Sequence, residues 1–118
     1  MSLDVFVRSY LNTLLWSETD DSGEPLDRNY SIEDISTDVV EAAEKDCAAF
    51  LEKFGGELTE DQHDDAGYDF ALTQNGHGVS FEDRDYYDRD LAKRMRDYSR
   101  AISEVSLYVG DDGIIHFM

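Results

Sequence analysis

The sequence predicts an α+β fold: two N-terminal helices, then a ββαββ arrangement whose small antiparallel sheet packs on helices. Two observations support this prediction. Apolar residues recur at helical spacing through the N-terminal half, and from residue 68 they alternate with the period of two that is typical of strands. A chain of 118 residues, 41% of them apolar, suffices for one core. We therefore expect a single domain, 1–118, with an acidic helical part (1–66) and a hairpin–helix–hairpin part (67–118).

Two helices are predicted in the N-terminal half. Residues 3–16 carry an apolar stripe on one side and polar residues on the other. A longer helix is expected over residues 31–54, with Ser31 as its N-cap, an acidic residue three positions later and a Gly-Gly pair after its end. Residues 17–30 and 57–66 lack a period and are expected to be loops.

The C-terminal half is predicted to hold two hairpins around a third helix. Strands at residues 68–73 and 79–82 are joined by an Asn-Gly-His-Gly segment, a typical hairpin connection. A helix is expected over residues 85–102. Residues 105–109 and 114–117 alternate again about a Gly-Asp-Asp-Gly turn, which completes a sheet of about four strands.

The charge is strongly negative and unevenly distributed. The net charge is −18; residues 1–66 hold 18 acidic and 4 basic side chains, whereas residues 67–118 hold 10 and 6. A surface of this charge repels nucleic acid and anionic lipid and attracts basic partners. No apolar run has the length of a membrane span. The single cysteine, Cys47, cannot form an internal disulfide and lies in a helical pattern, which indicates a buried thiol and a cytoplasmic protein.

Residues 67–84 (GYDFALTQNGHGVSFEDR) and the LYVGDDG at residues 107–113 carry a family resemblance. They are similar to a group of small, functionally uncharacterised proteins of tailed bacteriophages. In that group an Asp-Phe, a Leu-Thr, an Asn-Gly-His-Gly turn, a Phe and an Asp-Arg recur in this order. The matching residues here are Asp69, Phe70, Leu72, Thr73, Asn75, Gly76, His77, Gly78, Phe81, Asp83 and Arg84. The acidic helical half lies outside the resemblance.

This sequence departs from the family at three positions. The relatives tend to have Trp at the positions of Ala71 and Glu82, and Arg at the position of Gln74. A binding surface that those residues form in relatives is therefore weakened here. The resemblance implies a phage accessory protein that acts in the cytoplasm of a bacterial host, and it implies no particular chemistry. Together with the uneven charge, it leads us to expect binding to a host or defence protein.

The Asn-Gly-His-Gly segment is the candidate catalytic site. His77 lies between two glycines at a predicted loop tip, and Asp69, Asp83 and Arg84 flank the hairpin. In one interpretation His77 is a general base and Arg84 an anion clamp in a small hydrolase or metal-dependent enzyme. In the other, the turn is structural, and Asp83 and Arg84 form an ion pair that caps the third helix. No nucleophile or second base accompanies the histidine, which favours the second interpretation.

No metal or cofactor site is predicted. His63 is adjacent to Asp64 and Asp65, but the ligand spacing of a zinc motif is missing. The acidic segment from Asp61 lacks the Gly and Glu that an EF-hand requires. We interpret these acids as solvated loop residues.

The second predicted helix carries the candidate partner-binding surface. Asp34, Asp38 and Glu41 are spaced i, i+4, i+7 and form a stripe that Glu44 and Glu52 extend. Such a row imitates the charge of a DNA backbone and fits the basic groove of a DNA-binding enzyme. The alternative is a solvated acidic surface, as in a halophile.

The third predicted helix holds most of the basic residues of its half. Arg89, Lys93, Arg96 and Arg100 share one side, among neighbouring aspartates. We expect this side to dock onto the acidic half of the same chain, or of a second copy in a homodimer. The net charge opposes direct binding of nucleic acid.

The sequence thus favours a non-enzymatic acidic protein that binds a partner with a basic surface, with DNA mimicry as its sharpest form. Two alternatives stay open: an enzyme centred on His77, and a structural or self-assembling component.

Overall fold

The fold is mostly helical, with a small sheet at its C-terminal end. The computed structural model describes residues 2–20, 22–76, 81–102 and 104–117. Its α-helices are α1 (Ser2–Ser17), α2 (Thr37–Phe54), α3 (Glu60–Gln74) and α4 (Arg89–Arg100), and its antiparallel strands are β1 (Leu107–Val109) and β2 (Ile115–Phe117). Short 3-10 turns are η1 (Leu26–Arg28), η2 (Ile32–Asp34), η3 (Gly55–Glu57) and η4 (Phe81–Asp83). The predicted α+β class is confirmed.

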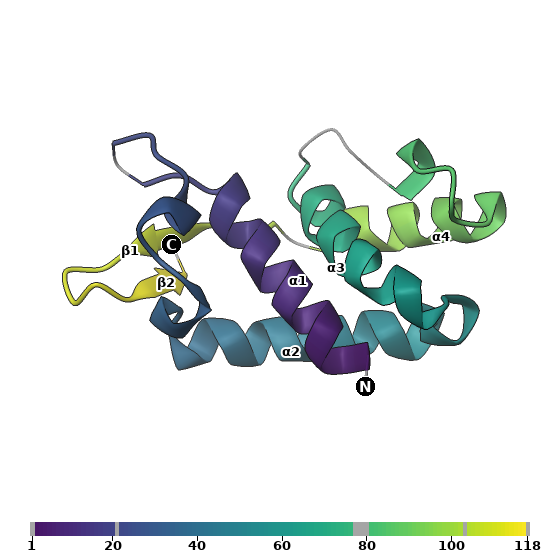
Figure 1. Cartoon of the computed structure of the whole chain (residues 1–118), viewed down its shortest axis with the longest axis horizontal. Helices are drawn as coiled ribbons and strands as arrows, with labels where there is room; N and C mark the ends of the chain where they lie inside the picture. Colours follow the sequence, from purple (N-terminus) through teal and green to yellow (C-terminus); the bar gives the residue numbers. More distant parts are fainter. Residues whose placement is uncertain (1, 21, 77–80, 103, 118) are drawn as a thin grey trace.

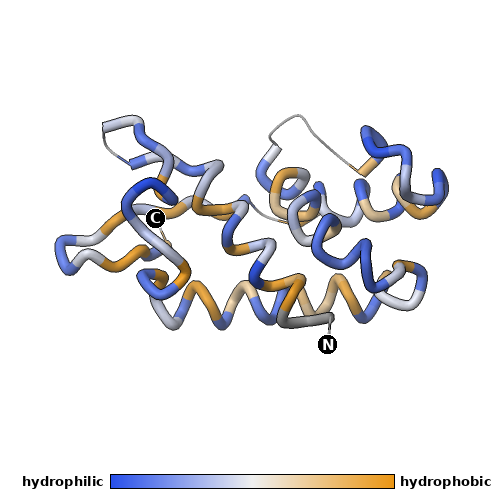
Figure 2. Tube along the Cα trace, viewed as in Figure 1, coloured by the Kyte–Doolittle hydropathy of each residue, from blue (hydrophilic) through white to orange (hydrophobic). Residues whose placement is uncertain are grey.

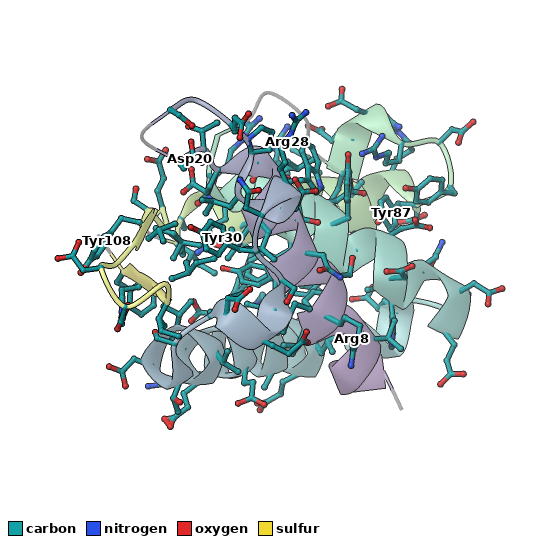
Figure 3. The ribbon with its side chains drawn as sticks, turned by 60° about the vertical axis from the view of Figure 1, so that its left-hand side comes forward. Arg8, Asp20, Arg28, Tyr30, Tyr87 and Tyr108 are labelled. Atoms are coloured by element: carbon teal, nitrogen blue, oxygen red, sulfur yellow. The ribbon has the colours of Figure 1, made fainter. Side chains whose placement is uncertain are left out.

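The helices pack around α2, which runs along the long axis of the molecule. Figure 1 shows α1 crossing α2, α3 beside α1, and the hairpin at the end where α2 begins. Tyr30 and Tyr108 lie toward this hairpin end, and Tyr87 lies at the opposite end (Figure 3). Among the described residues, no helix has the length and apolarity needed to cross a membrane.

Phe50 of α2 is the centre of the core. Its ring centroid lies 5.1 Å from that of Phe6 in α1, 4.8 Å from that of Phe70 in α3 and 5.8 Å from that of Phe81 in η4, and all four rings are fully buried. Aromatic pairs at these separations stabilise beyond the area they bury. Hydrophobic and hydrophilic residues alternate along the coils of α2 (Figure 2), as expected of a helix with one side in this core. Cys47 is buried on the same side, as predicted.

Three predicted elements are confirmed with shifted ends. The first helix extends one residue beyond each end of 3–16, the third predicted helix forms as the shorter α4, and the last hairpin pairs β1 with β2 about the Gly-Asp-Asp-Gly turn. The shortening of α4 has a local cause: Asp88 accepts the Leu91 N–H at 3.1 Å and caps the helix, so residues 85–88 stay outside it.

The predicted first hairpin is wrong. Residues 68–73 lie in α3, residues 77–80 lie outside the described residues, and Phe81–Asp83 forms a 3-10 turn, so the sheet has two strands and the ββαββ order is not found. The alternation misled because α3 is buried at every position from Asp69 to Gln74. A helix end covered on all sides loses its 3.6-residue signal.

The predicted loop at residues 57–66 is also wrong from Glu60 onward. Thr59 and Gln62 form a capping box, in which the Thr59 N–H donates to the Gln62 side chain at 3.0 Å. Two orphan donors of the first helical turn are thereby satisfied, and α3 begins here.

The long second helix is divided in two. Ser31 and Asp34 do form the expected capping box, but it closes the 3-10 turn η2. Ile35 is extended, the Ser36 N–H donates to the Ile115 carbonyl at 2.9 Å, and the Ser36 side chain then caps α2. The chain leaves the helical conformation because this bond to β2 requires an extended segment.

Helices α1 and α3 approach each other closely at Gly67. A Cβ added there would lie 2.6 Å from the Phe6 carbonyl oxygen, so a larger residue does not fit without movement. On either side of this contact, the Ser9 hydroxyl donates to the Asp64 carbonyl at 2.6 Å, and the Tyr10 hydroxyl donates to Gln74 at 2.6 Å. These contacts fix the orientation of α3 against α1, and with it the position of Asp69.

Candidate functional site

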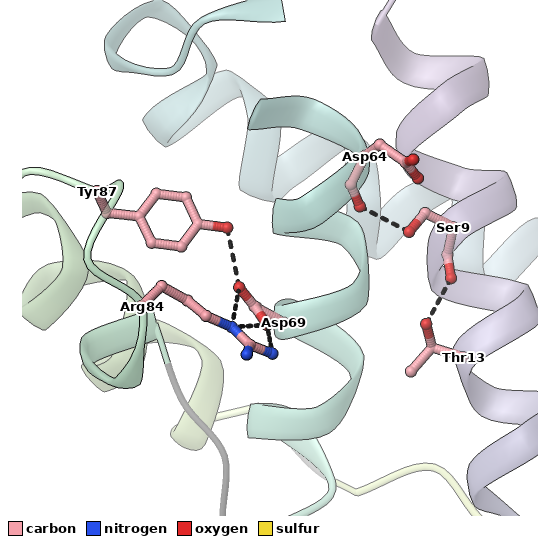
Figure 4. Close-up of polar contacts among 6 residues, drawn as sticks. All are labelled: Ser9, Thr13, Asp64, Asp69, Arg84 and Tyr87. Atoms are coloured by element: carbon pink, nitrogen blue, oxygen red, sulfur yellow. Dashed lines mark hydrogen bonds and ion pairs between the residues drawn. The ribbon is translucent and has the colours of Figure 1, made fainter. Parts of the chain in front are cut away.

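Three side chains from two segments form a cluster on α3 in which Asp69 and Tyr87 are buried and Arg84 is partly exposed; we call it the Asp69 cluster (Asp69, Arg84, Tyr87). Asp69 is fully buried. Its Oδ1 accepts from Nη2 and Nε of Arg84 at 2.8 and 3.0 Å, and its Oδ2 accepts from the Tyr87 hydroxyl at 2.9 Å (Figure 4). The cluster ties the segment between η4 and α4 to the side of α3.

The electrostatics of the cluster follow from burial and from the charge pair. Burial raises the pKa of the Asp69 carboxyl, against the opposing effect of the hydrogen bonds from Arg84 and Tyr87. The hydrogen bond to Asp69 raises the pKa of Arg84, and burial raises the pKa of the Tyr87 hydroxyl. A guanidinium fork and a phenol that meet on one carboxylate fit an ionised Asp69. Both oxygens of Asp69 accept hydrogen bonds, so the Asp69 cluster holds the two segments together.

A shallow hollow of about 350 Å³ lies beside the Asp69 cluster, between α1 and α3. Its lining residues are Ser9, Asp64, Asp65, Tyr68, Arg84 and Tyr86. The Tyr68 ring centroid lies 5.6 Å from the Arg84 guanidinium carbon and 5.6 Å from the Trp16 ring. Trp16 and Tyr86 are 40% and 43% exposed. Exposed aromatic rings beside carboxylates form a surface suited to contact with another protein.

The structure brings only part of the predicted catalytic set together. Asp69 and Arg84 pair, although they are separated by 15 residues. Asp83 is exposed at the end of η4, and the described ion pair of Arg84 is with Asp69. His77 lies outside the described residues. The predicted capping of the third helix by Asp83 and Arg84 is wrong, because Asp88 caps α4.

Asn75 and Gly76, from the Asn-Gly-His-Gly segment, have structural contacts. The Asn75 side chain accepts the Val105 N–H at 2.8 Å and donates to the Val105 carbonyl at 3.2 Å. Gly76 has φ +69°, a left-handed conformation that glycine adopts without strain, as α3 ends. The amide thus pins the C-terminal end of α3 to the segment that leads into β1.

Four of the five predicted partner-binding residues lie on α2: Asp38, Glu41, Glu44 and Glu52, which we call the α2 carboxylates. All four are exposed, and no ion pair joins any of them to another described residue. The fifth, Asp34, is displaced from the predicted stripe. It lies in η2 and accepts the Ser31 N–H at 2.9 Å, because the chain is extended at Ile35.

The arginines of the third predicted helix pair largely within the chain. Arg94 binds Glu57 of the acidic half at 2.7 Å and Asp90 at 2.8 Å. Arg96 pairs with Glu82 and Asp97. Arg94, which contacts the acidic half, is not one of the four residues predicted to dock there, and the described ion pairs of Arg96 stay within residues 67–118.

The histidine of the acidic segment is buried in α3. His63 is 7% exposed, and neither ring nitrogen has a hydrogen-bond partner among the described residues. Within the same residues, no three side chains of the metal-ligating types are grouped closely enough to hold an ion.

Sequence reasoning missed the residues that depend on α3. Tyr87 was not singled out as a partner of Asp69, nor were Trp16, Tyr68 and Tyr86 as a surface. The signal that was available is the Thr-x-x-Gln capping box formed by Thr59 and Gln62. A helix from that point places Tyr68 one turn after Asp64 on one side.

Comparison with known proteins gives no assignment: no family model matches the chain, nor does any curated protein or any solved structure.

Proposed function

We propose that this protein binds a basic partner protein through the α2 carboxylates and catalyses no reaction. The observation that supports this most directly is their state: exposed, on one helix, and without an ion pair among the described residues, whereas Arg84, Arg94 and Arg96 are occupied by the chain's own carboxylates. A net charge of −18 adds a field of the same sign. The Asp69 cluster has a structural role in this proposal, because both oxygens of Asp69 are bonded.

The opposite side of α2 anchors the helix backbone that carries the carboxylates. Val39, Ala43, Cys47, Phe50 and Phe54 are buried along that side. A backbone that is already helical needs no ordering when a partner binds, so only the side chains lose entropy. From Asp38 to Glu52 the row spans about 21 Å at 1.5 Å per residue. The row is longer than the screening length of about 8 Å at physiological salt. Its two ends therefore interact with a basic surface largely independently, at separate points.

The resemblance to phage proteins supports a host or defence protein of the bacterial cytoplasm as the partner. A DNA-binding enzyme is the sharpest version, because its groove is lined to receive a row of phosphates. Asp38, Glu41 and Glu44 succeed one another every three residues, so their charges lie about 4.5 Å apart along the axis.

Affinity capture from a bacterial lysate tests the proposal with two matched variants. D38N/E41Q/E44Q/E52Q removes four charges from α2, and D27N/E60Q/D61N/D85N removes four exposed charges elsewhere. We expect the wild-type protein and the second variant to retain the same basic protein at low salt, and the first variant to lose it. Equal retention by both variants would rule out the α2 row.

Competition then separates the two versions of the proposal. Release of the captured protein by duplex DNA as well as by salt supports DNA mimicry. Release by salt alone limits the function to binding of a basic protein. Light scattering on the free chain checks the self-assembly alternative, which predicts a concentration-dependent mass.

A further inference from the structure

The two edges of the C-terminal hairpin differ in how they are covered. Along β2, Ile35 forms a parallel bridge with Ile115, and the Ser36 N–H donates to the Ile115 carbonyl at 2.9 Å. Along β1, the outer edge faces a groove of about 340 Å³. The residues opposite β1 in this groove are Thr19, Asp20, Ser22 and Tyr30. Asp20 and Tyr30 lie toward the same end of the molecule as Tyr108 (Figure 3).

The register shows which backbone groups point into this groove. The Gly110 N–H donates to the Ile114 carbonyl at 2.8 Å. Bonded pairs alternate along an antiparallel ladder, so Tyr108 and its partner form the next one, and the N–H and C=O groups of Leu107 and Val109 point away from β2. On β2, the outward carbonyl opposite Val109 accepts the bond from residue 36, which agrees with this alternation. No described residue bonds the outward groups of Leu107 and Val109.

The far wall of the groove is itself ordered. The Asp20 N–H donates to the Glu24 carbonyl at 2.8 Å, and Thr19 forms an antiparallel bridge with Pro25. Asp20 Oδ1 accepts from the Ser22 N–H at 2.9 Å and from the Glu24 N–H at 3.0 Å. An open strand edge opposite a fixed wall suits an extended chain, which pairs with the edge through its own backbone.

The charges around the groove select the chemistry of that chain. Asp20 lines it, Asp111 and Asp112 follow β1 in the turn, and no Lys or Arg is among the described lining residues. Hydrogen bonds from Ser22 and Glu24 lower the pKa of Asp20, so this carboxylate stays ionised. A second copy of the protein is disfavoured as the occupant, because each copy carries a net charge of −18.

We propose that the outer edge of β1 binds an extended, Lys- or Arg-rich segment of a partner protein, which adds to the hairpin as a third strand. The site is distinct from the α2 carboxylates and goes beyond their proposed function. Backbone pairing with Leu107 and Val109 supplies the register, and Asp20 supplies the preference for positive charge.

A synthetic peptide tests the pairing without altering the protein. The probe is a fluorescein-labelled peptide of alternating Lys and Val, and its binding to the full chain is followed by anisotropy. Successive N–H groups of a strand point to opposite edges, so two isomers are compared, one N-methylated at every Val and one at every Lys. We expect one isomer to lose about tenfold or more in affinity, because two backbone bonds are removed, and the other to retain binding.

Two substitutions at one residue give the matched test on the protein. V109P removes an outward N–H, and proline is tolerated where an edge N–H faces solvent. V109T keeps the N–H and the β-branched shape. We expect about a tenfold loss of peptide affinity for V109P and an unchanged affinity for V109T, with both melting temperatures close to that of the wild type. D20N, which keeps the Oδ1 acceptor, should weaken binding of the Lys peptide several-fold.

Several results would overturn the proposal. They are an absence of binding, equal affinity of the two N-methylated isomers, or equal affinity of a peptide with Glu in place of Lys. A dimer of the free chain that V109P dissociates would assign the edge to a second copy instead. The two isomers should still bind with different affinities to D38N/E41Q/E44Q/E52Q. The peptide test therefore does not depend on whether the α2 carboxylates bind a partner.

Discussion

The Arg84 guanidinium holds the fully buried carboxylate of Asp69 through two nitrogens, at 2.8 and 3.0 Å, and so joins α3 to the segment that leads into α4. Such an ion pair stabilises a fold only modestly, because the Asp69 carboxylate is taken fully out of water and Arg84, whose side chain is 28% exposed, is taken out in part. Removal of one partner is expensive, since the other charge is left without compensation. The intact pair therefore adds little net stability, but removing either partner should disrupt the packing of this segment on α3.

We predict that D69N lowers the free energy of unfolding by about 3 kcal/mol, because it removes the charge that Arg84 requires. R84K should also destabilise, since a single ammonium cannot make the two-nitrogen contact. Y87F, which removes one donor to Asp69, should lose about 1 kcal/mol. Urea unfolding of the three variants measures this order. If R84K is as stable as the wild type, the fork geometry is irrelevant.

We predict that G67A destabilises the protein by about 1–3 kcal/mol, since its methyl group would lie 2.6 Å from the Phe6 carbonyl oxygen. In an ordinary helix interior the same change stabilises by up to about 1 kcal/mol. The sign of the effect therefore reports the close approach of α1 and α3. Thermal melting of G67A measures the loss. Gly56, where an added Cβ meets nothing within 4 Å, supplies the control: G56A should be neutral or slightly stabilising when melted in the same way.

We predict that Asp20 stabilises the fold above pH 4 and that this contribution is lost in acid. The pKa of Asp20 is lowered in the folded protein, first by the Ser22 side chain, and an unfolded Asp titrates near about 3.9. Stability is therefore present above the unfolded pKa and is lost as the pH falls through the folded pKa. Urea unfolding of wild type and D20N at pH 6 and at about pH 2.5 should show a difference that shrinks in acid. A constant difference would contradict this prediction.

Elements with a local signal are predictable from the sequence, and α3 is the element where that signal is hidden. It approaches α1 closely at Gly67, which has no apolar side chain to mark the contact in the sequence, and Phe70 near its C-terminal end packs on Phe6 and Tyr10. The last turns of α3 are buried on every side. Phe70 and Leu72 therefore alternate with their neighbours as strand residues do, although the segment is helical. Only tertiary packing decides between a helix and a strand in this segment.

The candidate site shows the same division between local and distant determinants. Asp69 and Arg84 were expected to converge, and they do so from a helix and a loop instead of from two strands. The α2 carboxylates follow from helical spacing alone. Asp34 does not, because the extension of Ile35 toward Ile115 in β2, about 80 residues away, is invisible in the local pattern.

We predict that N75A lowers the free energy of unfolding by about 1–2 kcal/mol, because two hydrogen bonds to Val105 are lost and the half-buried Val105 backbone groups are left without these partners. The loss should also loosen the hairpin. Amide hydrogen exchange at Tyr108 and Gly110, whose N–H groups lie in the ladder, should accelerate more than exchange within α1.

The control for this prediction is N12A, an exposed asparagine in α1. Alanine has the higher helix propensity, so N12A should be neutral or slightly stabilising and should leave exchange at the hairpin unchanged. N75D separates the two bonds, since it keeps an acceptor for the Val105 N–H but loses the donor and places a charge against the carbonyl. It should be no more stable than N75A. Wild-type stability in N75A would contradict a structural role for the two hydrogen bonds between Asn75 and Val105.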